Sequence, residues 1–79
     1  MDQIITQAIR DIIALEATND PSWDARIADI SLATIRYLDE NLMEIDERID
    51  HYLHDFDIRR KDQKYAIWQT SEVIEALGD

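Results

Sequence analysis

Apolar positions recur at helical spacing along most of the chain, and the longest regular stretch lies between residues 35 and 56. There the spacing alternates between three and four residues, which is typical of a helix with an apolar packing seam. The seam residues are Ile35, Leu38, Leu42, Ile45, Ile49, Tyr52 and Phe56. We expect this seam to pack against another part of the chain or against a second copy.

Two more helices are predicted, one at each end of the chain. Over residues 2–17 the isoleucines at 5, 9 and 12 mark one side of a helix, and Asp2 near its start complements the helix dipole. Over residues 63–77 another apolar stripe predicts the last helix, with Asp62 as its N-terminal cap. Gly78 follows at the position where a C-terminal cap belongs.

The clearest break in the pattern is Thr18–Asn19–Asp20–Pro21. Asp20 can cap a new helix and Pro21 fits its first position, where no amide hydrogen is needed. In that helix one seam is followed by Trp23, Ile27, Ile30 and Thr34, and then another, one position out of phase, by Leu32, Ile35 and Leu38. Such a phase change predicts a wide apolar face, local unwinding or a bend.

Beyond Leu38 two alternatives stay open. Asn41 could cap a new helix with Glu44 completing a capping box, so that the chain breaks at Asp39–Asn41. Alternatively one helix runs from residue 21 to about 57, which would be about 55 Å long and would need a partner chain to cover it. Because the seam keeps its phase through this region, it favours a continuous or gently kinked helix.

One glycine and one proline in 79 residues favour a few long helices over many short strands. We therefore predict an all-α fold: a single domain over residues 1–79 built as a small bundle of three to four helices, or a helical dimer with a long central helix. The chain has no cysteine, no apolar run of membrane-spanning length and no N-terminal pattern of a signal peptide. A cytoplasmic location is the expectation.

Charge changes the picture, because 18 acids against 8 bases give a formal net charge of −10. Such a balance opposes direct binding to nucleic acid or to anionic membranes, and it suits a protein partner with a basic surface. Eight acids lie between residues 39 and 57, where Arg48 is the only base. These candidate partner-binding residues are Asp39, Glu40, Glu44, Asp46, Glu47, Asp50, Asp55 and Asp57.

Candidate chemistry is sparse. His51 and His54 are three residues apart on one helix, but no second histidine-bearing helix exists to complete a metal site. The basic run Arg59, Arg60, Lys61 and Lys64 suits the C-terminus of a helix. We find no activated nucleophile and no phosphate-binding loop, so the sequence predicts no catalytic residue, no metal and no cofactor.

Acidic pairs at helical spacing are the best argument for an enzyme. They are Glu44, Glu47 and Asp50 in one segment and Glu72 and Glu75 in another. Paired acidic helices hold magnesium in all-helical nucleotide hydrolases, which makes a magnesium-dependent hydrolase a remote alternative. The pairs are expected on the outer side of their helices, away from the seam.

The sequence thus favours a small non-enzymatic binding protein. The first hypothesis is an inhibitor that docks a row of acids, spaced like phosphates along one helix, on the nucleic-acid-binding surface of a partner, in the manner of phage or plasmid anti-restriction and anti-CRISPR proteins. The alternative is a homo-oligomeric helical adaptor, such as a homodimer, or an antitoxin or immunity partner that uses the Ile35–Phe56 seam as its interface.

Overall fold

The computed structural model describes residues 2–18 and 23–78 and contains five helices and no strand within those residues. The helices are α1 (Gln3–Glu16), α2 (Trp23–Glu40), α3 (Glu47–His54), α4 (Phe56–Lys61) and α5 (Gln63–Ala76). The all-α prediction and the small helical bundle are confirmed, with more helices than the three to four expected. The chain forms two compact units, Met1–Met43 and Glu44–Asp79. The expectation of one domain stays a prediction.

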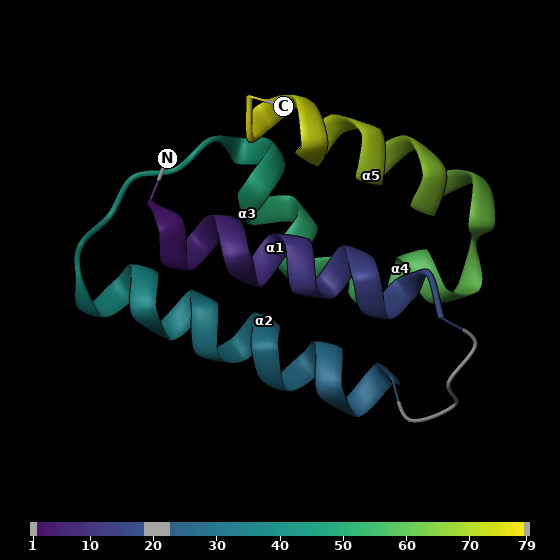
Figure 1. Ribbon diagram of the computed structural model, residues 1–79, viewed down its shortest axis with the longest axis horizontal. Helices are drawn as coiled ribbons and strands as arrows, with labels where there is room; N and C mark the ends of the chain where they lie inside the picture. The colour runs from purple at the N-terminus through teal and green to yellow at the C-terminus, as the bar shows by residue number, and fades with distance from the viewer. Residues whose placement is uncertain (1, 19–22, 79) are drawn as a thin grey trace. The chain divides into compact units, whose positions relative to one another are not determined.

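The first unit is a helical hairpin in which α1 and α2 run in opposite directions (Figure 1). Asp2 caps α1, since its Oδ1 accepts from the backbone N–H of Ile4 at 2.8 Å and of Ile5 at 3.3 Å. The predicted apolar side of α1 is confirmed, because Ile5, Ile9 and Ile12 are fully buried. The proposed cap and first turn at Asp20 and Pro21 lie outside the described residues.

Helix α2 is continuous despite the phase change in its apolar pattern. Its buried positions are Ile27, Ser31, Thr34 and Leu38. This is a single seam at four-three-four spacing, in which small polar side chains occupy the middle. Leu32, which belonged to the second expected seam, is 58% exposed. The apparent change of phase arises because the sequence pattern counted apolar residues and passed over a buried serine.

A Schellman motif ends α2, so the expectation of a continuous helix from 21 to about 57 is wrong. The N–H of Met43 donates to the carbonyl of Leu38 at 3.0 Å, and the N–H of Leu42 donates to that of Asp39 at 3.3 Å. Leu42 has φ 50°, the left-handed conformation that glycine usually supplies at this position. Without a glycine to mark it, this helix end leaves no conventional signal in the sequence.

The second unit begins at a different cap from the one expected. Asp46 caps α3, with its Oδ1 accepting from the N–H of Arg48 at 2.9 Å, so Asn41 and Glu44 form no capping box. Helix α3 ends at His54, and α4 begins after Asp55. The expected start of the last helix is confirmed, because Asp62 Oδ1 accepts from the N–H of Tyr65 at 3.1 Å. Gly78, at φ 82°, follows the C-terminal cap as expected.

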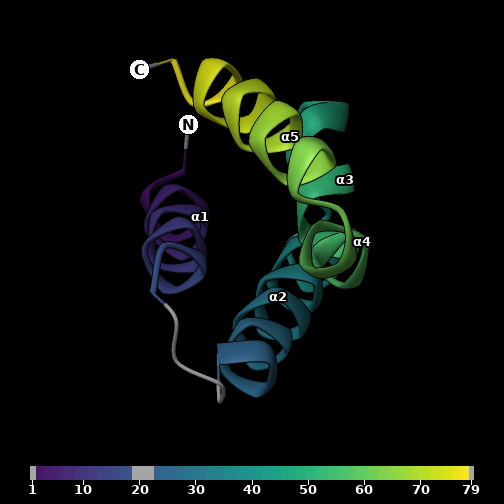
Figure 2. The same ribbon diagram turned by 90° about the vertical axis from the view of Figure 1, so that its right-hand side faces the viewer.

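Helix α5 packs against both α3 and α4 and so holds the second unit together (Figure 2). Its buried face centres on Gln69 and Val73, while Ile67 is 64% exposed and Ile74 is 38% exposed. Burial therefore includes Val73 of the predicted apolar stripe but is shifted towards Gln69, so that Ile67 and Ile74 of the same stripe are exposed. The reason is a polar network that occupies the interior of this unit.

Candidate functional site

The eight predicted partner-binding acids do not share one helix. Asp39 and Glu40 end α2 in the first unit, and the other six belong to the second unit. Six of the eight lie exposed without a capping or internal role. These are Asp39, Glu40, Glu44, Glu47, Asp50 and Asp57. The straight row of carboxylates along one helix is therefore a wrong expectation, because the helix that was to carry it ends at Glu40.

Asp46 is committed to the start of α3. Besides capping the helix, it accepts from Arg48 Nε at 3.1 Å and from Arg48 Nη2 at 2.8 Å. The hydrogen bonds from the Arg48 side chain and backbone lower the pKa of Asp46 from 3.8 to about 2. The charge of Asp46 is thus used within the unit, where it holds the Arg48 side chain at the start of α3.

Asp55 is turned towards the interior of the second unit. Its Oδ2 accepts from Tyr65 Oη at 2.8 Å and from Gln69 Nε2 at 2.9 Å. The hydrogen bond to this carboxylate raises the pKa of Tyr65. Asp55 therefore links the α3–α4 junction to α5, and this role was not expected from its place in the acidic run.

Arg59 is a buried cation that was not predicted from the sequence pattern. It lies in the last turn of α4, as the basic run predicts, but it is only 3% exposed. Its Nη1 donates to the Tyr52 carbonyl and to Gln69 Oε1, both at 2.7 Å, and its guanidinium lies 3.7 Å from the centre of the Tyr52 ring. The signal was available: Arg59 continues the phase of Tyr52 and Phe56, so the seam does not stop but changes from apolar to polar.

The seam residues divide between the two units. Leu38, Ile49 and Tyr52 are buried, whereas Leu42 is 91% exposed. Ile35, Ile45 and Phe56 are half-buried. Leu42 leaves the seam because its left-handed backbone ends α2, so the seven residues do not form one continuous stripe. Their use as an assembly interface stays a prediction.

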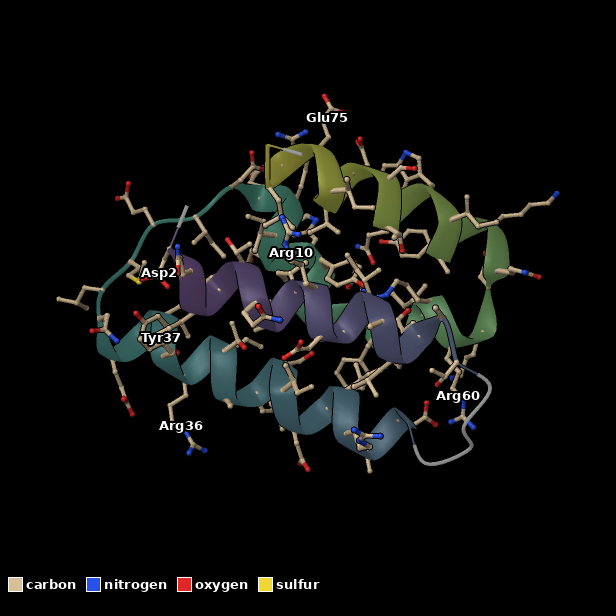
Figure 3. The ribbon with its side chains drawn as sticks, in the orientation of Figure 1. Asp2, Arg10, Arg36, Tyr37, Arg60 and Glu75 are labelled. Atoms are coloured by element: carbon tan, nitrogen blue, oxygen red, sulfur yellow. The ribbon has the colours of Figure 1, made fainter. Side chains whose placement is uncertain are left out.

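Tyr37 of α2 is half-buried and is hydrogen-bonded to the start of α1. Its Oη donates to Asp2 Oδ2 at 2.9 Å, and Figure 3 shows the two side chains meeting. This hydrogen bond lowers the pKa of Asp2 and raises that of Tyr37. Tyr37 therefore fastens the two helices of the hairpin together.

The two histidines have separate surroundings. His54 Nδ1 lies 2.9 Å from the Asp50 carbonyl oxygen and 3.6 Å from Asp50 Oδ1. His51 instead lines a groove between α3 and α5. Among residues 2–18 and 23–78, no three histidine or acidic side chains are grouped so as to hold a metal ion.

The second unit has a groove between α3 and α5, with a volume of about 110 Å³. We call it the α3–α5 groove. Its lining residues are Glu47, Arg48, His51, Tyr65, Trp68, Gln69 and Glu72. It thus brings together one member from each of the two acidic segments that the sequence singled out, Glu47 and Glu72.

No protein family, curated protein or solved structure matches this chain. Within the part of the chain that the structure describes, none of the helices is both long and apolar enough to cross a membrane. The features of the chain that bear on its function are therefore the distribution of charge and the surface of each unit.

Proposed function

We propose that this protein is a non-enzymatic binding protein that docks acidic surface on the basic, nucleic-acid-binding surface of a partner protein. The observation that supports this most is the charge of −10 in 79 residues. It is not confined to one segment: residues 1–43 contain eight acids and three bases, and residues 44–79 contain ten acids and five bases, so each unit has a net charge of −5.

The exposed carboxylates suit this role because they can occupy positions that phosphates would take on a basic surface. Asp46 and Asp55 serve the fold, so recognition falls to the exposed acids of α3, of α5 and of the segment before α3. Glu44, Glu47 and Asp50 are exposed there. Competition with nucleic acid would follow the manner of phage and plasmid anti-restriction and anti-CRISPR proteins, with acids from two helices in place of a single row.

Capture of partners from the native host at low and high salt tests the proposal, followed by measurement of the captured protein's DNA or RNA binding. We expect this protein to abolish that binding. The variant Glu44→Lys with Asp50→Lys should weaken the complex at least about tenfold, since like charges then face each other across the interface. Both residues are exposed, so the core is unaffected.

A matched control is Asp11→Lys with Asp29→Lys, which changes the total charge equally on exposed positions of the first unit. It should weaken the complex by less than about threefold, as expected for charges away from a contact. If both double variants bound and inhibited like the unaltered protein, the electrostatic docking proposed here would be wrong.

A second candidate is a homo-oligomeric adaptor or an antitoxin or immunity partner. It is favoured by large apolar side chains on the surface, above all Leu42 at 91% exposed and Ile67 at 64% exposed. Light scattering over a concentration series separates the candidates. A species whose mass grows with concentration and falls back in Leu42→Ser supports assembly, whereas a monomer at every concentration eliminates it.

A further inference from the structure

The α3–α5 groove combines an aromatic wall with acids on both rims. Trp68 is 56% exposed, and its ring lies 5.6 Å from that of Tyr65 at an angle of 46°. A large aromatic side chain left half-exposed in a concavity is typical of a binding anchor. The volume of about 110 Å³ is several times what one water molecule needs. The groove can therefore take a side chain of a partner.

The floor of the groove offers little hydrogen bonding to a ligand. Gln69 is 3% exposed, its Oε1 accepts from Arg59, and its Nε2 donates to Asp55 at 2.9 Å. Tyr65 Oη also donates to Asp55, at 2.8 Å. Because these polar ends are committed inside the unit, the floor presents mainly ring and aliphatic surface. This network also fixes Tyr65, against whose ring Trp68 packs at a tilt of 46°.

The rims supply the charge. Glu47 comes from α3 and Glu72 from α5, and the charge of Glu72 attracts Arg48. Arg48, the cation that lines the groove, is held by Asp46 at 2.8 Å and lies 3.7 Å from Glu75. Figure 3 shows Glu75 projecting outward from α5. Because Asp46 and Glu75 lie beside Arg48 and Glu47 and Glu72 line the groove, the acids outnumber the one arginine and the groove has a net negative charge.

We propose that the α3–α5 groove binds one arginine side chain of the partner's basic surface. A guanidinium stacks on an aromatic face while its N–H groups donate to carboxylates in its plane, which matches a tryptophan wall with an acid on either side. An aliphatic side chain would leave the charge of both rims unused. The inference rests on the proposed function, since it assigns the site at which the basic partner is recognised.

The probe is a blocked tripeptide, acetyl-Gly-Arg-Gly-amide, titrated into the full chain and followed by NMR of the two tryptophan indole N–H signals. We expect a saturable shift of the Trp68 signal, assigned from its absence in Trp68→Phe, and no shift of the Trp23 signal. The same tripeptide with citrulline, which has the shape of arginine without its charge, should not bind. The lysine tripeptide should bind at least about threefold more weakly, because it lacks the planar fork.

Variants then test the rims. Glu47→Gln and Glu72→Gln should each raise the dissociation constant of the arginine tripeptide about threefold, as for a partly exposed ion pair. Trp68→Ala, followed through the backbone amides of α3, should raise it about twofold to fivefold. Asp29→Asn is the matched control, because Asp29 is exposed, does not line the groove and is not among the acids assigned to recognition. It should leave the dissociation constant unchanged, and melting curves check that every variant is folded.

Three results would overturn the inference. They are no shift of the Trp68 signal at saturating peptide, equal weakening by Asp29→Asn and Glu47→Gln, or equal binding of the arginine and lysine tripeptides. A shift that depends on protein concentration without peptide would identify a second copy as the occupant instead. If a basic partner is captured but Glu47→Gln, Glu72→Gln and Trp68→Ala bind it normally, the groove assignment alone fails. If no basic partner is captured, the proposed function fails whatever the tripeptide does.

Discussion

At the scale of single residues, the interior of the second unit depends on Arg59. A buried arginine is expected only where its donors are satisfied, and here two acceptors and the face of Tyr52 surround it. Gln69 in turn donates a hydrogen bond to Asp55, which also accepts one from Tyr65. Removal of Arg59 would leave the Gln69 and Tyr52 acceptors buried and unsatisfied, which is more damaging than loss of the bonds themselves.

Arg59→Ala should lower the free energy of unfolding by about 2–4 kcal/mol. Urea unfolding followed by far-UV circular dichroism measures it. The matched control is Arg60→Ala, an exposed arginine next in the chain, which should cost less than about 1 kcal/mol. In the double variant with Gln69→Ala the two losses should be less than additive, because the residues share one hydrogen bond. Equal stability of the two arginine variants would refute the central place given to Arg59.

Asp46 predicts a specific loss of stability in acid. Its folded pKa of about 2 lies below the ordinary value of 3.8, so its contribution is fully present above pH 3.8 and is lost as pH falls towards about 2. In Asp46→Asn the helix keeps an N-terminal cap but loses the charge that binds Arg48. Wild type should therefore be the more stable above this window, and the difference should vanish at its lower end.

Urea midpoints at successive pH values measure that difference, and NMR titration of the Asp46 carboxyl carbon gives its pKa directly. Arg48→Ala should return the pKa towards 3.8, because the Arg48 side chain is the largest cause of the shift. A pKa that stays low in Arg48→Ala would show that the cap, and not the ion pair, is responsible.

At the scale of elements, the sequence indicated helices whose ends have conventional signals. Asp62 and Gly78 bound α5 as predicted, since both are standard capping residues. The end of α2 was missed because Leu42 stands where glycine is usual, and a seam can keep its phase through a break. The face of α5 was only partly predicted, because the buried side includes Gln69, a polar residue whose hydrogen bond from Arg59 the apolar pattern could not reveal. The α3–α5 groove could not be predicted from the sequence either, because Glu47 and Glu72 come together only through the packing of α3 on α5.

Leu42→Gly tests the end of α2. A left-handed conformation costs a side-chain-bearing residue about 1–2 kcal/mol, whereas glycine adopts it without that cost but loses about 0.5–1 kcal/mol in chain entropy. Because Leu42 is 91% exposed, little packing is lost. The variant should be as stable as wild type or more stable, by up to about 1 kcal/mol in thermal or urea unfolding.

Leu32→Gly is the matched control for this prediction. Leu32 is also exposed, at 58%, but it lies inside α2, where glycine should destabilise by about 1 kcal/mol. A helix that continued through residue 42 would give the same loss for both variants. Opposite signs therefore support the Schellman motif, and equal losses would contradict it.

At the scale of the whole molecule, the charge of −10 predicts that salt acts in opposite directions on the free protein and on its complex. Acids repel one another within each unit, so screening should raise the melting temperature of the free protein as salt is added from low ionic strength. The same screening weakens attraction to a basic partner, and the association rate should fall at least about tenfold between low and high salt. Melting curves and stopped-flow association at matched salt concentrations measure the two effects. Opposite signs exclude unfolding as the cause of weaker binding, which a capture experiment alone cannot do. A partner that binds equally at all salt concentrations would indicate recognition through apolar surface such as Leu42 and Ile67, and so would favour the oligomeric adaptor over electrostatic docking.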